Sequence, residues 1–194
     1  TTLNTVQITN NGTIGLSATG GSTTLNTVQI TNNGTIGLSA QMGADVTMRR
    51  CTVGRNARGG LELQDARFTI ENTFVLDNGS GSSAFGGVWI GAAGAGSTFS
   101  NNTLARNRAA AVAGGVVCTA SFSLVNSIVT SNTGAGPQID MRCANDSSYV
   151  GDTANLNAAD DHLTTGSTCC LDLGRSGADV PADDFDGDAR PCPA

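Results

Sequence analysis

The sequence predicts an all-β solenoid, in which short parallel strands wind into coils and each coil stacks on the one before it. Three observations predict this class: one 18-residue segment occurs twice without change, an asparagine ends each of a series of related segments, and no long stretch shows helical periodicity. The composition agrees, since aliphatic residues, Thr, Asn and 26 glycines suit strands joined by tight turns, whereas aromatic residues make up only 4% of the chain.

The repeat organises most of the chain. Residues 1–18 recur as residues 23–40, and four divergent copies follow at 46–56, 68–78, 97–107 and 122–132. The part that all six copies share ends on an asparagine, namely Asn11, Asn33, Asn56, Asn78, Asn107 and Asn132. Such a column predicts a ladder in which each side-chain amide bonds to the next across the strand spacing of about 4.8 Å. We expect a right-handed parallel β-helix of about six coils over residues 1–146, and an irregular tail over 147–194.

Apolar positions of the repeat predict the core. The third and eighth positions are expected to face inward, namely Leu3, Leu25, Met48, Ile70, Phe99 and Leu124, and Ile8, Ile30, Val53, Val75, Leu104 and Val129. A further strand follows each asparagine, with the expected inward pairs Ile14/Leu16, Ile36/Leu38, Leu61/Leu63, Val88/Ile90, Val116/Cys118 and Ile139/Met141. The Gly-Gly pairs before several of these strands are expected at corners with positive φ. On the outside, Asp77 and Arg106 are expected to form a stacked ion pair.

Several segments resemble a known family. The strings IENTFVLDN, SNNTLARNRAAAVAGGVV and LVNSIVTSNTGAGPQI are similar to coils of the pectin-lyase-like superfamily of right-handed parallel β-helix proteins, across about residues 1–145. The string DDFDGDARP resembles the Asp-rich closing motif of exported bacterial proteins of this type. The resemblance implies the fold and export, but no particular activity, because this fold hosts lyases, hydrolases, adhesins and phage tailspikes.

The six cysteines favour disulfides in an exported protein. Adjacent Cys169 and Cys170 with the single His162 do not have the spacing of a zinc site. The candidates for disulfides that staple the tail are Cys143, Cys169, Cys170 and Cys192. Cys51 and Cys118 fall at inward positions two coils apart, and are expected to be buried thiols. We therefore expect a secreted or cell-surface protein.

Charge and hydropathy exclude two classes of partner. The net charge is −6, and the ten basic residues are all arginines without a basic stripe, so nucleic acid is excluded as a partner. No apolar run approaches the roughly 20 residues of a membrane span, so we expect no membrane insertion.

The longer loops of the later coils predict a ligand-binding face. Insertions in solenoids gather on one side, and here they place Phe85, Arg108 and the outward Trp89 and Asp140 on that side. The Trp89 ring could stack on a sugar, or a loop could simply cover it. Outward Phe74 and Ile128 predict either a patch for a partner or packing beneath a neighbouring segment.

The tail contains a candidate calcium site. Alternating carboxylates at Asp184, Asp186 and Asp188 can wrap a hard cation, and the alternative is a solvated acidic turn. His162 is expected to be a surface residue. The coils offer no cluster of carboxylates of the kind that glycoside hydrolysis requires.

Three functional hypotheses remain open. The first is a non-catalytic exported or cell-surface scaffold, adhesin or glycan-binding module with a polysaccharide as partner. The second is a fragment of a polysaccharide lyase or glycoside hydrolase. The third is self-assembly through the N-terminal coil, which has no visible cap and could stack on another β-helix end.

Overall fold

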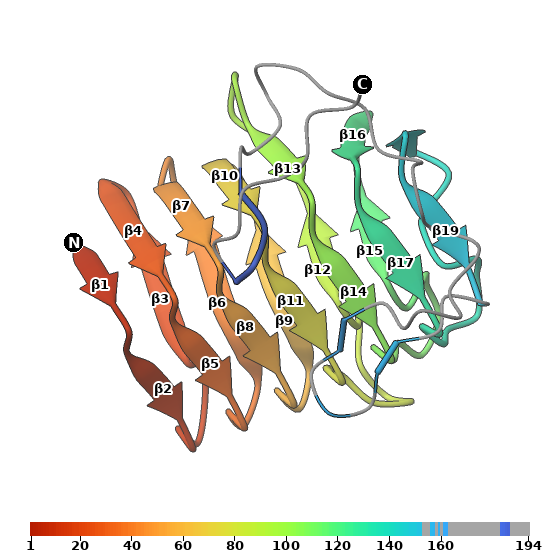
Figure 1. Cartoon of the computed structure of the whole chain (residues 1–194), viewed down its shortest axis with the longest axis horizontal. Helices are drawn as coiled ribbons and strands as arrows, with labels where there is room; N and C mark the ends of the chain where they lie inside the picture. Colours follow the sequence, from red (N-terminus) through yellow and green to blue (C-terminus); the bar gives the residue numbers. More distant parts are fainter. Residues whose placement is uncertain (153–155, 158, 160, 163–182, 187–194) are drawn as a thin grey trace.

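The computed structural model describes residues 1–152, 156, 157, 159, 161, 162 and 183–186. The regular elements in these residues are strands, wound into a right-handed parallel β-helix as the sequence predicts (Figure 1). No helix that could span a membrane occurs among the described residues. Each coil contributes up to three strands, and strands of successive coils pair in parallel to form three sheets, called A, B and C below.

The three sheets run the length of the solenoid. Sheet A has seven strands, β1 (Thr2–Asn4), β4 (Ser22–Asn26), β7 (Asp45–Arg49), β10 (Arg67–Glu71), β13 (Thr98–Ser100), β16 (Phe122–Val125) and β18 (Cys143–Asp146). Sheet B also has seven, β2 (Gln7–Thr9), β5 (Gln29–Thr31), β8 (Thr52–Gly54), β11 (Phe74–Leu76), β14 (Thr103–Ala105), β17 (Ile128–Thr130) and β19 (Tyr149–Gly151). Sheet C has five, β3 (Leu16–Thr19), β6 (Ile36–Gln41), β9 (Gly59–Leu63), β12 (Val88–Ile90) and β15 (Val116–Cys118).

A seventh coil lies beyond the six that the repeat indicated. Its strands β18 and β19 pair with β16 and β17, and so the coils extend past residue 146. The repeat did not reveal this coil because its residues no longer follow the template: Asn145 is exposed opposite the buried Leu124.

The inward columns of sheets A and B are confirmed. In sheet A, Leu25 pairs with Leu3 and Met48, and Ile70 continues the column. In sheet B, the column from Ile8 to Val129 is paired residue by residue. The second to sixth members of both columns have no exposed surface, so they form the core of the solenoid.

In sheet C the predicted pairs were wrong in part for the first two coils, and the last predicted pair was wrong at Met141. Leu38 pairs with Leu61, and Ile36 lies opposite Gly59 and packs against Phe85 outside the core. The inward pairs of the first two coils are therefore Leu16/Ala18 and Leu38/Ala40, in line with Leu61/Leu63. Met141 is 93% exposed, because the chain turns there and the Cys143 N–H bonds back to the Asp140 carbonyl at 2.9 Å.

The asparagine ladder is confirmed as a continuous chain of hydrogen bonds. Each amide donates to the carbonyl oxygen of the next, from Asn11 to Asn33 at 2.9 Å, and onward through every member to Asn132. Asn132 then donates to the side chain of Gln138 at 2.9 Å, which closes the ladder. Ladder amides also bond backbone carbonyls of sheet B, as Asn78 does with Val53 at 2.9 Å.

A second ladder, which the sequence did not reveal, occupies the corner between sheets A and B. The Thr73 N–H donates to Asn102 Oδ1 at 2.9 Å, the Asn102 N–H to Ser127 Oγ at 3.2 Å, and the Ser127 N–H to Ser148 Oγ at 2.9 Å. The residue type changes from coil to coil, so there is no identical column to recognise. At both corners, side chains thereby give hydrogen-bond partners to buried backbone groups.

The expectation that the Gly-Gly pairs before the strands of sheet C have positive φ was wrong, since none of Gly59–Gly60, Gly86–Gly87 and Gly114–Gly115 has it. Between sheets B and C the residues with positive φ are chiefly Asn10, Asn32, Arg55, Asp77, Arg106 and Ser131, and between sheets A and B they are Thr5, Thr27, Arg50, Asn72, Asn101, Asn126 and Ser147. The paired glycines are needed for close approach instead. A Cβ on Gly86 would lie 2.3 Å from the carbonyl oxygen of Gly114 in the next coil.

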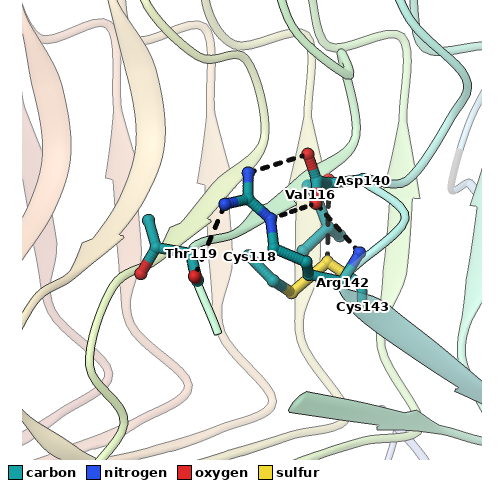
Figure 2. Close-up of a disulfide and its surroundings, with 6 residues drawn as sticks. All are labelled: Val116, Cys118, Thr119, Asp140, Arg142 and Cys143. Atoms are coloured by element: carbon teal, nitrogen blue, oxygen red, sulfur yellow. Dashed lines mark hydrogen bonds and ion pairs between the residues drawn. A yellow bond between two sulfur atoms is a disulfide. The ribbon is translucent and has the colours of Figure 1, made fainter. Parts of the chain in front are cut away.

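One disulfide closes the C-terminal coil. Cys118 at the end of β15 bonds to Cys143 at the start of β18, with Cα atoms 5.4 Å apart, beside the ion pair of Arg142 and Asp140 (Figure 2). The prediction of a free thiol at Cys118 was wrong, because Cys143 also turns into the core and reaches it. Cys51 is a buried free thiol as predicted, and its burial raises its pKa. Cys169, Cys170 and Cys192 lie outside the described residues.

Candidate ligand-binding groove

The structure brings Trp89 and Phe85 together on the outer face of sheet C. Trp89 lies between Glu62 and Val117 of the neighbouring coils, and its half-buried ring meets the Phe85 ring edge-on, with centroids 6.0 Å apart. Phe85 is only 5% exposed, because it turns inward from its loop and joins Ala113 and Val117 in a small apolar cluster. Phe85 therefore packs against Trp89, the ring that was predicted either to stack on a sugar or to be covered by a loop.

The other two residues expected at this face have different surroundings. The Asp140 carboxylate accepts a hydrogen bond from Arg142 Nε at 3.0 Å, and this bond is the main reason that its pKa lies below the ordinary value. Arg108 has an exposed side chain, and its backbone bridges Gly79 and Thr133 in the adjacent coils. Neither residue joins Trp89 in a described cavity.

A cavity of about 370 Å³ lies elsewhere, along the corner between sheets A and B. We call it the corner groove, and its floor consists of side chains from three successive coils. Asn72, Asn101 and Asn126 line it from the corner, and Phe74, Thr103 and Ile128 line it from the outer face of sheet B. The three asparagines all have positive φ and follow paired strands of sheet A, so they recur at the coil spacing of about 4.8 Å.

Two segments of the tail form the other wall. The Phe185 ring lies 4.3 Å from that of Phe74, and the His162 ring meets Phe74 edge-on at 5.5 Å. Leu156 packs against the same cluster, which also includes Leu76 and Ala105. The outward Phe74 is thus covered by a neighbouring segment, one of the two outcomes that the sequence predicted.

Charged side chains tie the tail to the coils. Arg106 bonds both carboxylate oxygens of Asp77, at 2.9 and 3.0 Å, which confirms the stacked ion pair, and also contacts Asp161 at 2.8 Å. The bond to Asp77, and then that to Asp161, raises the pKa of Arg106. Asp183 pairs with Arg50, and its carbonyl oxygen accepts a bond from Asn72 at 2.9 Å.

A second cavity of about 210 Å³ shares Asn72 with the corner groove. It is lined by two ion pairs, Arg49 with Glu71 at 2.9 Å and Arg50 with Asp183. Burial is the main cause of a raised pKa at Glu71; the positive charge of Arg49 opposes it and the negative charge of Asp183 adds to it. Glu71 and Asp183 therefore line one cavity, which no spacing in the sequence indicates.

The structure does not bring the residues expected to bind calcium together in one described site. Asp184 lines the corner groove, whereas Asp186 pairs with His162, whose Nε2 lies 3.0 Å from its Oδ2. Asp188 lies outside the described residues. Among the described part of the chain, no three His, Cys, Asp or Glu side chains gather as a metal site. Calcium binding stays a prediction.

Most residues of the groove could not be found from the sequence. Phe74 and Ile128 were recognisable, because they are apolar where other copies have Gln or Thr. Asp161, His162 and Phe185 come from a tail without a repeat, so nothing in the sequence indicates which coil they touch.

Comparison with known proteins agrees with this architecture. Residues 1–154 match the family described as "Right handed beta helix region". Neither the curated proteins nor the solved structures include a match to the chain.

Proposed function

Since this chain belongs to the right-handed β-helix family, we propose that it is a non-catalytic glycan-binding module that holds an oligosaccharide in the corner groove. The observation that carries the proposal is the lining of the groove. Amides of three successive coils line it beside Phe74 of sheet B, and the tail lines it with His162 and Phe185. Hydroxyl groups of a sugar chain can bond the amides, and its apolar ring faces suit the aromatic side chains.

The stacking of the coils supports a polymeric ligand. Asn72, Asn101 and Asn126 each directly follow a strand of sheet A whose last residues pair with one another, so their backbone positions are held by the solenoid and repeat in one direction. A site on such regular elements is more rigid than a site on loops. A ligand with repeating polar groups can therefore contact several coils in the same way.

The buried disulfide supports the export of this module. Cys118 of β15 and Cys143 of β18 are both buried in the core, and such bonds form and persist in oxidising compartments. We propose a secreted or cell-surface location on this basis.

The test compares two glycine variants by calorimetric titration with neutral, acidic and amino-sugar oligosaccharides. Asn101→Gly removes one amide from the groove, and Asn32→Gly removes an exposed amide at the other corner. Glycine accepts the positive φ of both positions without strain. Asn101→Gly is expected to weaken binding about tenfold and Asn32→Gly to leave it unchanged. Equal affinities, or no binding of any glycan by the wild-type protein, would refute the proposal.

A second candidate function, hydrolysis of a polysaccharide, is favoured by Glu71. Glu71 is a buried acid with a raised pKa that lines the second cavity together with Asp183. In a glycoside hydrolase, a general acid with a raised pKa works with a second carboxylate that acts as base or nucleophile. Release of reducing ends from polysaccharides tests it, with Glu71→Gln expected to abolish release and Asp65→Asn to preserve it. A wild-type protein that releases no product excludes this candidate.

A further inference from the structure

The tail already contacts two of the groups that line the corner groove. The Asn72 side-chain amide donates to the carbonyl oxygen of Asp183 at 2.9 Å, and the Phe185 ring packs against the Phe74 ring, with centroids 4.3 Å apart. Asn72 and Phe74 are both buried. We propose that residues 183–186, called the strap below, act as an internal competitor that fills one end of the groove until a glycan displaces them. The inference rests on the proposed function and adds its regulation.

The strap lies at the surface of the solenoid, and solvent weakens its contacts. Asp183 pairs with Arg50, and each of these two side chains is 35% exposed. An ion pair with this much exposure contributes little to stability. Phe185 is half-buried and Asp186 is exposed. A segment with so little buried surface opens at a small cost in free energy, so the strap can leave while the coils stay folded.

The coils beneath the strap are held more firmly. Phe74 pairs with Thr103, and Thr103 pairs with Ile128, in three hydrogen-bonded strands of sheet B. When the strap leaves, Asn72 and Phe74 extend the groove by one coil, in register with the two coils that follow. A glycan that displaces the strap therefore gains contacts with one more coil.

The competition should appear in the apparent affinity for a glycan. A site that is open in only a fraction of the molecules binds more weakly by that fraction, and a weaker strap enlarges the fraction. A variant that loses a strap contact should therefore bind more tightly. If Phe185 were instead a fixed wall of the site, its removal would take away a contact with the sugar and weaken binding. The direction of the change separates these two roles.

The experiment measures the binding of glucose, galacturonate and glucosamine oligomers, each in a short and a long form, to the full chain by calorimetry. Phe185→Ala removes the ring, and Asp183→Ala removes the ion pair with Arg50. The control, Met42→Ala, removes a 76% exposed apolar side chain at the corner between sheets C and A. Phe185→Ala should tighten the binding of long oligomers at least about fivefold, and that of short ones less. Asp183→Ala should act in the same direction, and Met42→Ala should have no effect.

The outcomes separate this inference from the proposed function. If the wild type binds a glycan and Phe185→Ala binds it equally or more weakly, the inference is overturned and glycan binding stands. An equal gain for short and long oligomers, or the same gain in Met42→Ala, would overturn it as well. Because Phe185→Ala and Asp183→Ala remove different contacts, a folding defect in one variant leaves the other as the test. If no oligomer binds the wild type or either strap variant, both the inference and the proposed function fail.

Discussion

At the scale of single residues, the side-chain amides of the asparagine ladder stabilise the buried corner between sheets B and C. Asn78 has no exposed surface, and its Oδ1 accepts from both the backbone and the side chain of Asn56, at 3.1 and 2.9 Å. Its Nδ2 donates to Val53 and to Asn107. Only an amide supplies donors and an acceptor in this geometry, which is why the sequence repeats asparagine here.

Replacing Asn78 by alanine is expected to lower the free energy of unfolding by about 3 kcal/mol or more, because several buried groups lose their partners at once. The control is Asn4→Ala, which removes an exposed amide that accepts one bond from Asn26. That variant should stay within about 0.5 kcal/mol of the wild type. Urea denaturation measures both, and similar losses in the two variants would contradict this role of the ladder.

Glu71 predicts a pH dependence of stability. Its pKa is raised in the folded protein, so the folded state binds the proton more tightly than the unfolded state. Its contribution to stability is therefore present below the ordinary value of 4.5 and is lost as the pH rises through the raised folded pKa. The unfolding free energy of wild type minus that of Glu71→Gln should fall over this window. Denaturation at a series of pH values measures it, and a difference that rises with pH would contradict the burial of this acid.

At the scale of strands and corners, sheets A and B follow the sequence closely and sheet C does not. The third and eighth positions are apolar in every copy, so the register of sheets A and B could be predicted from the repeat alone. In sheet C, both Ile36 and Leu38 are apolar, and alternation did not show that the first lies outside the core. Glycine at the matching position of the later coils, such as Gly59, is the signal that would have placed it.

The paired glycines of sheet C predict a steric effect. Gly86→Ala would place a methyl group 2.3 Å from a backbone oxygen of the next coil, and the coils would have to separate. We expect a loss of about 2 kcal/mol or more in unfolding free energy. Gly81→Ala in the same loop meets no atom within 4 Å and should be neutral or slightly stabilising. Thermal unfolding compares the two variants, and equal melting temperatures would show that the coils tolerate the methyl group.

At the scale of the whole molecule, the solenoid behaves as a series of coils, each in contact with its neighbours. Leu3, Ile8 and Leu16 of the first coil are partly exposed, whereas their copies Leu25, Ile30 and Leu38 in the second coil have no exposed surface. The 18 residues that contain these side chains are identical in the two coils, so the difference comes from the surroundings of each coil.

An added coil is therefore expected to stabilise the protein. A further copy of residues 1–22 placed before Thr1 would cover the exposed apolar side chains of the first coil. The free energy of unfolding should rise by about 2 kcal/mol or more. A flexible Gly/Ser extension of equal length is the control and should have no effect. If the added coil is no better than this extension, then the stacking of identical coils does not stabilise the solenoid.

The position of the corner groove could not be predicted from the repeat, because the groove depends on how the tail docks on the coils. The repeat fixes where Phe74 and Ile128 lie, but the tail has no periodicity to align with the coils. Its contacts, such as Asp161 with Arg106, join residues that are far apart in the sequence and do not share a column. Long-range docking of an irregular segment depends on side-chain fit, which a pattern of residue types does not specify.

The central claim is that a glycan binds in the corner groove, and one titration tests it with two built-in probes. His162 is the single histidine and lies at the groove, and Trp89 is the single tryptophan and lies on sheet C. Neutral, acidic and amino-sugar oligosaccharides are added in turn while the imidazole and indole proton resonances are followed by NMR. We predict a saturable shift of the His162 resonances with Trp89 unchanged. A saturable shift of Trp89 with His162 unchanged would place the ligand on sheet C and contradict the claim.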